Sequence, residues 1–328
     1  MIKNVVIIGM GALGLLFGQR IHTALGDENF CFVMDDERAR KHREDIYTIN
    51  GEGVTFPILS SSEYLCSKRP SPDLIIVATK YSGLYQAREM AKELMDNDTT
   101  VISILNGISS EDILAEEIPR NNIIDCIALG MDAVREGTHL TYKNVGMLRV
   151  GLNERESQQD RLNGSESQQD RHDGMDSQQH RLDALKAFFE ETGIPYEIRD
   201  DIRRDMWNKL MMNVGINQTC MVYEANYGEA LHTSPAKEDL YSAMHEVIEV
   251  ANLEGVNLTE DDFRWNIDVF ETLNPEGLPS MRQDAIAKRP SEVELFAGTI
   301  IKYANKHGVA VPTNEKYYAL IKEMESKY

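Results

Sequence analysis

The chain has 328 residues, a length that suits two domains better than one. Hydrophobic residues make up 42% and aromatic residues 7%, which is ordinary for a globular protein and excludes a disordered one. The 54 acidic and 34 basic side chains give a net charge of −20, so the surface as a whole repels nucleic acid and anionic membranes.

Residues 1 to about 150 alternate short apolar runs with amphipathic segments. The predicted buried strands are Val5–Ile8, Phe30–Met34, Leu74–Ala78, Val101–Ile104 and Ile123–Ala128. Between them, segments such as Gly83–Met95 and Ser110–Glu117 have helical periodicity. This alternation predicts an α/β domain in which helices cover both faces of a parallel sheet.

The turn after the first predicted strand carries a dinucleotide-binding pattern, Gly9-Met10-Gly11-Ala12-Leu13-Gly14. The first glycine permits a tight turn, the second lets the backbone approach a pyrophosphate, and the third lets helix and strand pack closely. We therefore predict that these six residues bind a dinucleotide. FAD and the nicotinamide dinucleotides share the pattern, so the chemistry depends on the rest of the chain.

The end of the second predicted strand bears on the choice between NAD(H) and NADP(H). Asp35 lies there, and its carboxylate is placed to accept a hydrogen bond from a ribose 2′-hydroxyl and to repel a 2′-phosphate. Arg38, Arg40 and Lys41 follow closely and can instead hold a 2′-phosphate. Both alternatives stay open at the level of sequence.

A repeat with a period of ten residues fills about 156–175. Copies begin at Glu156 and Glu166, and a third copy at Asp176 runs into an amphipathic helix. We interpret the first two copies as a polar insert, either a surface loop or a helical extension, in preference to a docking tag.

From about residue 182 onward the pattern is helical. The predicted helices are Met206–Val222, Lys237–Glu254, Glu260–Thr272, Ser291–His307 and Asn314–Lys327. We expect a Rossmann-type dinucleotide-binding domain over residues 1–181, including the insert, and an all-α substrate and catalytic domain over residues 182–328.

One face of the first of these helices carries polar side chains. Lys209, Asn213 and Asn217 are spaced four residues apart, whereas the rest of the helix is apolar and predicted to be buried. A buried ammonium and two buried amides need partners or a ligand. The face suits ketone reduction, in which hydride attacks the carbonyl carbon and a lysine of lowered pKa protonates the oxygen. A polar seam satisfied by the neighbouring backbone is the structural alternative.

The chain resembles the ketopantoate reductase (2-dehydropantoate 2-reductase) family over nearly its whole length apart from the insert, because the motifs of that family occur in it in the same order. The motifs are Gly9–Gly14, Val-Ala-Thr-Lys80, Leu-Asn106-Gly, Trp207-Asn-Lys209 with Asn213 and Asn217, Pro279-Ser280-Met-Arg-Gln-Asp284, Arg289-Pro-Ser-Glu292, and His307–Pro312.

The resemblance implies a role for each matched position. Lys209 is expected to donate the proton to the keto oxygen, and Asn106, Asn213, Asn217 and Ser280 are expected to bind the keto acid. The residues expected at the cofactor, besides the glycine motif and Asp35, are Lys80, Asn106, Ala133 and Glu292. The cofactor implied by the family is NADP(H).

The chain departs from the family pattern at three places. Gln218 stands where the family commonly has proline, and Tyr227 stands where it has a substrate-binding asparagine, with Asn226 one place early. Asp35 stands where members that use NADPH place an arginine. The first two leave open which keto acid is the substrate.

We therefore expect NAD(P)H-dependent reduction of ketopantoate, or a related branched 2-keto acid, in a cleft between the two domains, as a step of pantothenate biosynthesis. One alternative is a reductase of an aromatic 2-keto acid, and another is a non-catalytic dinucleotide sensor. For the reductase, the rate should decline as pH rises through the pKa of the proton donor.

The cysteine spacing and the lengths of the apolar runs bear on the compartment and the partners expected for the protein. The cysteines Cys31, Cys66, Cys126 and Cys220 have no metal or disulfide spacing, which predicts buried reduced thiols and no metal site. No apolar run reaches membrane-spanning length. We expect a cytoplasmic protein that binds a small-molecule substrate, with a homodimer as one possibility.

Overall fold

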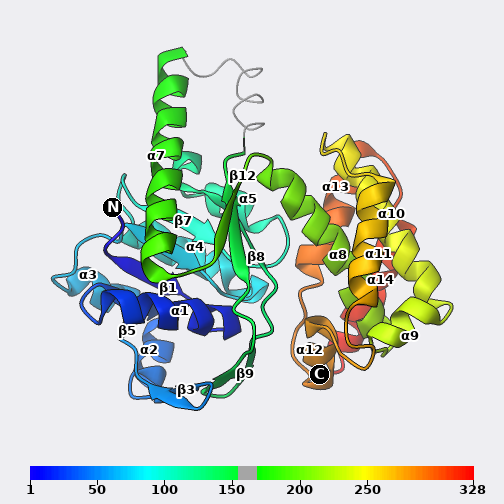
Figure 1. The fold of residues 1–328 in the computed structure, drawn as a ribbon, viewed down its shortest axis with the longest axis horizontal. Helices are drawn as coiled ribbons and strands as arrows, with labels where there is room; N and C mark the ends of the chain where they lie inside the picture. The colour runs from blue at the N-terminus through cyan, green and yellow to red at the C-terminus, as the bar shows by residue number, and fades with distance from the viewer. Residues whose placement is uncertain (154–167) are drawn as a thin grey trace. The chain divides into compact units, whose positions relative to one another are not determined.

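The computed structural model describes residues 1–153 and 168–328, and these divide into two compact units. Unit 1 comprises residues 1–105 and 110–202, and unit 2 comprises residues 106–109 and 203–328. The chain therefore passes from one unit to the other three times. Figure 1 shows the helices and strands along the chain.

Unit 1 contains a parallel sheet, as the sequence predicted, but its fifth strand is Ile58–Ser60, whereas the predicted strand Ile123–Ala128 corresponds to Asp125–Leu129 in another sheet. The strands of the parallel sheet, in spatial order, are β5 (Ile58–Ser60), β2 (Phe30–Met34), β1 (Val5–Ile8), β6 (Leu74–Val77) and β7 (Thr100–Ser103). Residues of β1, β2, β6 and β7 are buried throughout, as expected of strands covered on both faces.

The order of the strands places helices on both faces of this sheet. The connection through α1 (Ala12–Leu25) leads from β1 outward to β2, whereas the connection through α4 (Leu84–Leu94) leads from β6 outward in the opposite direction to β7. Since parallel crossovers are right-handed, the two helices cover opposite faces. Parallel strands also bring their carboxyl ends to one edge, where α1 begins and where η1 (Tyr81–Gly83) precedes α4.

Two smaller sheets and several short helices complete unit 1. One sheet has the order β4 (Glu52–Val54), β3 (Tyr47–Ile49), β10 (His139–Thr141), β9 (Val134–Glu136), and the other has the order β12 (Tyr196–Arg199), β11 (Met147–Gly151), β8 (Asp125–Leu129). The further helices are α2 (Asp36–His42), α3 (Ser61–Cys66), α5 (Ser110–Ala115), η2 (Arg120–Asn122) and α7 (Gln168–Thr192).

The position of the domain boundary differs from the one expected at residues 181 and 182. That boundary lies inside α7, which packs on α1, and the chain then adds β12 to a sheet of unit 1 before it enters unit 2 at Arg203. Backbone pairing of Leu148–Gly151 with Tyr196–Arg199 thus keeps the segment from 182 to 202 in unit 1. The first copy of the ten-residue repeat and the start of the second lie outside the described residues, and α7 begins at Gln168.

Unit 2 is helical, as expected. Its helices are α8 (Ile202–Val222), α9 (Tyr227–His232), α10 (Ala236–Leu253), α11 (Glu260–Glu271), α12 (Ser280–Ile286), α13 (Thr299–His307) and α14 (Pro312–Glu325). A short π-helical turn, η3 (Glu294–Gly298), leads directly into α13, where the sequence predicted one continuous helix. Among the described residues, none of the helices combines the length and the apolar character that a membrane span requires.

The four cysteines differ in how far they are buried. Cys31, Cys126 and Cys220 are buried and form no disulfide, as predicted, whereas Cys66 at the end of α3 is exposed, contrary to the prediction. Burial raises the pKa of both the Cys31 and the Cys220 thiols to about 12, so neither thiol ionises readily near neutral pH.

A buried carboxyl group in α5 gives unit 1 a pH-dependent stability. Glu111 is 4% exposed, and burial together with the charge of Asp125 raises its pKa to about 8. Between about pH 4.5 and pH 8 the folded chain keeps a proton that the unfolded chain releases. The free energy of unfolding should therefore fall as pH rises through this range, by about 1.4 kcal/mol per pH unit from this group.

Glu111→Gln should remove this contribution, because glutamine keeps the shape of the side chain but does not titrate. We expect a flatter pH dependence and a higher melting temperature at pH 8 to 9, measured by thermal denaturation at pH 5, 7 and 9. The exposed Glu44→Gln variant is the matched control. Parallel pH profiles for wild type and Glu111→Gln would contradict the assignment.

Candidate active site

The glycine turn of unit 1 is shaped by close backbone contacts. Gly9 has φ = +111°, and a Cβ added there would lie 2.6 Å from the carbonyl carbon of Ala78, so only glycine fits. A Cβ on Gly14 would lie 2.1 Å from the carbonyl oxygen of Gly9, which explains how closely α1 packs on the turn. A Cβ on Gly11 would make only an ordinary contact, 3.6 Å from the carbonyl oxygen of Ala78. Sterics inside the protein therefore do not require glycine at position 11.

The start of α1 is open to an anion. Gly11 is the N-cap residue of this helix, and no side chain caps it. The free backbone N–H groups of the first turn, together with the helix dipole, favour a negatively charged group at such a position. The turn thus fits the pyrophosphate of a dinucleotide, and Met10, Ala12 and Leu13 lie in the same segment.

Asp35 follows β2 and acts as the N-cap of α2. Its Oδ1 accepts a hydrogen bond from the backbone N–H of Arg38 at 2.8 Å, and its Oδ2 lies 3.5 Å from Nε of the same arginine. Nε of Arg40 donates to the carbonyl oxygen of Asp36 at 3.1 Å. The carboxylate is thus held at the carboxyl end of β2, and both nearby guanidinium groups are engaged locally.

The remaining predicted cofactor residues of unit 1 occupy loops. Lys80 is exposed at the start of η1, beyond the carboxyl end of β6, and Ala133 immediately precedes β9 and packs partly against the core. Between β6 and Lys80 lies Thr79, whose hydroxyl oxygen is buried without a hydrogen-bond partner among the described residues. Sequence reasoning missed this hydroxyl because its burial depends on the packing of η1 and the glycine turn.

Lys209, on α8 in unit 2, contacts a residue that is distant in sequence. Its Nζ donates to Oδ1 of Asn106 at 3.0 Å, and Nδ2 of Asn106 donates to Oε2 of Glu292 at 2.9 Å. All three side chains are partly buried. Asn106 thus accepts from the ammonium and donates to the carboxylate, and it links the two charged groups.

Asn106 is held in unit 2 by the short segment to which it belongs. Gly107 has φ = +92°, and a Cβ there would lie 3.1 Å from the carbonyl oxygen of Leu295, so the segment runs close to η3. The hydroxyl groups of Ser109 and Thr299 are hydrogen bonded at 2.8 Å. These contacts fix the backbone that directly follows Asn106.

The two asparagines of the same α8 face form a second chain of hydrogen bonds. The Ser280 hydroxyl donates to Oδ1 of Asn217 at 3.1 Å, and Nδ2 of Asn217 donates to Oδ1 of Asn213 at 3.2 Å. Nδ2 of Asn213 is buried and has no partner among the described residues. A buried amide donor without an acceptor costs free energy, and an oxygen of a bound ligand would satisfy it.

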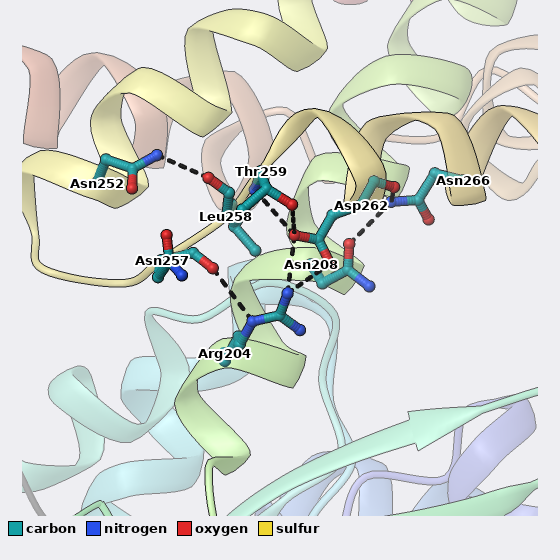
Figure 2. A network of polar contacts seen from close by, with 8 residues as sticks. All are labelled: Arg204, Asn208, Asn252, Asn257, Leu258, Thr259, Asp262 and Asn266. Atoms are coloured by element: carbon teal, nitrogen blue, oxygen red, sulfur yellow. Dashed lines mark hydrogen bonds and ion pairs between the residues drawn. The ribbon is translucent and has the colours of Figure 1, made fainter.

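A polar network joins α8 to α11 (Figure 2). The guanidinium of Arg204 contacts both carboxylate oxygens of Asp262, at 2.6 and 2.8 Å. Burial alone would raise the pKa of Asp262, but hydrogen bonds from Thr259 and Arg204 outweigh this effect and leave the pKa below its ordinary value. The carboxylate therefore stays charged and keeps α11 fixed to the first turn of α8.

The same network reaches the residue next to Lys209. Nδ2 of Asn266 donates to Oδ1 of Asn208 at 2.8 Å and to the carbonyl oxygen of Asp262 at 3.0 Å (Figure 2). Because Asn208 directly precedes Lys209, these bonds limit rotation of the part of α8 that carries the amine.

The residues that depart from the family pattern have structural partners. Gln218 is fully buried, and its Oε1 accepts from the backbone N–H of Ala297 at 3.0 Å, inside the π-helical turn. Asn226 caps α9 by accepting from the N–H of Glu229. Tyr227 is half-buried, and burial raises its pKa to about 12, so its hydroxyl stays protonated.

The predicted residues thus fall into two groups. Unit 2 contains Lys209, Asn106, Glu292, Asn213, Asn217 and Ser280, linked in two hydrogen-bonded chains along one face of α8. Unit 1 contains the glycine turn, Asp35, Lys80 and Ala133. An ammonium beside amide and hydroxyl groups suits a substrate that carries a carboxylate and a carbonyl oxygen.

Two family models match the chain. The model described as Ketopantoate reductase PanE/ApbA matches residues 5–154, and the model described as Ketopantoate reductase PanE/ApbA C terminal matches residues 201–325.

Similar proteins cover nearly the whole chain. The 2-dehydropantoate 2-reductase of Streptococcus pyogenes serotype M1 is 24% identical over 320 residues, which cover 94% of this chain and 93% of the relative. The 2-dehydropantoate 2-reductase of Lactococcus lactis is 25% identical over 317 residues, which cover 94% of each.

Solved structures share the fold over its full length. The complex of D-mandelate dehydrogenase with NADH has a TM-score of 0.80 and 25% identity, covering 99% of both chains. The PanE/ApbA family ketopantoate reductase from Ralstonia eutropha has a TM-score of 0.78 and 21% identity, again covering 99% of both chains.

Proposed function

This chain belongs to the ketopantoate reductase family of oxidoreductases, and we propose that it reduces a branched 2-keto acid, with ketopantoate as the leading substrate, to the 2-hydroxy acid. The product of that reaction would be pantoate, which serves pantothenate biosynthesis. Relatives named 2-dehydropantoate 2-reductase that match over 93 to 94% of their length support this proposal.

The observation that carries the proposal is the hydrogen bond between Nζ of Lys209 and Oδ1 of Asn106. It holds a partly buried ammonium on the same helical face as Asn213 and Asn217. A group in that position can donate a proton to a keto oxygen as negative charge develops there. A non-catalytic dinucleotide sensor has no need of such a proton donor, so this arrangement disfavours that alternative.

The remaining polar groups of the face would bind the keto acid. The unsatisfied Nδ2 of Asn213 would donate to an oxygen of the substrate, and Asn217 and the Ser280 hydroxyl would hold its carboxylate. Glu292 would orient Asn106 through their hydrogen bond and thereby fix the position of Lys209.

The glycine turn and Ala133 would hold a nicotinamide dinucleotide, and Lys80 and Asn106 are the residues that the family resemblance assigns to its nicotinamide end. The resemblance also assigns Glu292 to the cofactor. When bound, the reduced nicotinamide supplies the hydride. We infer that NADH is preferred, because Asp35 places a carboxylate at the end of β2 while Arg38 and Arg40 are held by local contacts.

An aromatic keto acid is the second candidate substrate. The structure of D-mandelate dehydrogenase, 25% identical to this chain, was determined with NADH. Tyr227, at the start of α9, offers a half-buried aromatic ring where the family pattern has an asparagine. Aromatic rings pack favourably against each other, so this residue favours an aromatic substituent on the keto acid.

Titrating the protein with NADH and NADPH, each with and without ketopantoate, tests nucleotide and substrate together. We expect tighter binding of NADH and oxidation of it with ketopantoate. Initial rates with ketopantoate, 2-ketoisovalerate and phenylglyoxylate separate the branched substrate from the aromatic one. Tight dinucleotide binding without turnover of any keto acid would refute the reductase and favour the sensor.

A further inference from the structure

An arginine that no sequence motif identifies contacts the glycine turn. Arg135, on the edge strand β9, donates from Nη1 to the carbonyl oxygen of Met10. Its Nε donates to the carbonyl oxygen of Gly137 at 2.8 Å, a second contact that holds the guanidinium. The contact joins residues 125 positions apart, so only the folded chain brings them together.

The surroundings hold both Arg135 and Met10 in place. The guanidinium carbon of Arg135 lies 5.9 Å from the ring centroid of Tyr47, a cation–π distance. The hydroxyl of Tyr47 lies 3.9 Å from the sulfur of Met10. Tyr47 is only 1% exposed, so its ring is a rigid support for both residues.

Peptide geometry gives the Arg135 contact a consequence for ligand binding. A trans peptide is planar, and its C=O and N–H bonds point in opposite directions. Arg135 holds the carbonyl of the Met10–Gly11 peptide on its own side. The N–H of Gly11 in that peptide must then point away from Arg135, at the uncapped start of α1.

We propose that Arg135 is a positioning residue of the phosphate-binding turn, which orients the Gly11 N–H toward the pyrophosphate of the dinucleotide. This inference rests on the proposed function only in assuming that a dinucleotide binds there. Arg135 also brings positive charge to the turn of a chain whose net charge is −20. Since the pyrophosphate is common to NADH and NADPH, the contribution of Arg135 should be equal for both.

The test is titration of wild type, Arg135→Ala and Arg135→Lys with NADH and with NADPH. We expect the alanine variant to bind both dinucleotides about 10- to 100-fold more weakly, by the same factor, because a hydrogen bond from a charged group is lost. Lysine keeps the charge but lacks the two-donor fork, so it should restore part of the affinity. The KM for the keto acid at saturating dinucleotide should not change.

Arg149→Ala is the matched control, because Arg149 is also a strand arginine of unit 1, paired with Glu197 at 2.7 Å. Thermal melting of each variant identifies any loss of folding, in which case the lysine variant carries the comparison. Weaker binding of NADPH alone would show that Arg135 contacts the 2′-phosphate, and unchanged binding would show no role; either result overturns the inference. If the wild type binds neither dinucleotide, the proposed function itself is refuted instead.

Discussion

Lys209→Ala should lower kcat by about 100- to 10,000-fold, the range expected when a general acid is removed. Dinucleotide affinity should change far less, because the substitution leaves intact the backbone N–H groups of the glycine turn, which would hold the pyrophosphate. Steady-state rates of NADH oxidation with ketopantoate, together with a dinucleotide titration, measure both quantities.

Two further variants separate the charge of Lys209 from its proton. Lys209→Arg keeps a positive charge beside Asn106, but a guanidinium does not release a proton near neutral pH. We expect this variant to recover the KM for the keto acid but not kcat. Lys302→Ala, an exposed lysine on α13, is the control and should behave as wild type. Near-native turnover by Lys209→Ala would exclude Lys209 as the proton donor.

Substitution by alanine should affect protein stability at one glycine of this turn and leave it unchanged at another. Gly9→Ala should destabilise the protein by roughly 2 to 5 kcal/mol, because the new methyl group meets the Ala78 backbone at 2.6 Å and φ is +111°. Gly11→Ala should fold as wild type, because φ is −67° and the nearest atom is at an ordinary contact distance.

Dinucleotide binding completes this comparison. The methyl group of Gly11→Ala should lie where the backbone must approach the pyrophosphate, so binding should weaken by roughly two orders of magnitude. Chemical denaturation measures the first effect and fluorescence titration the second. A Gly11→Ala variant with full affinity would mean that the pyrophosphate does not bind at this turn.

The elements that the sequence predicted well are long or continuously apolar. β1 and β2 coincide with the predicted runs Val5–Ile8 and Phe30–Met34, and α11 differs from its prediction by one residue. In these segments, burial of one face or of both faces imposes a recognisable spacing of apolar residues along the chain. The strands β3 and β4 have three residues each, too few for periodicity to appear, and they were missed.

The site could be predicted only in part, for a different reason. The spacing of Lys209, Asn213 and Asn217 is local and visible in the sequence, whereas the partner of Lys209 lies 103 residues away. The resemblance to a family named Asn106, but not the hydrogen bond that links it to Lys209 and Glu292. The buried hydroxyl of Thr79 and the contact of Arg135 with Met10 likewise depend on tertiary packing and have no signal in the sequence.

The chain's three passages between the units limit how this enzyme can be divided or recombined. A fragment of residues 203–328 would contain Lys209 but not Asn106, which the structure assigns to the same unit. A chimera that replaces the first 200 residues with those of a relative would replace the hydrogen-bond acceptor of the lysine as well. The helical half is therefore not a transferable module, and its amine depends on a four-residue segment encoded in the other half of the gene.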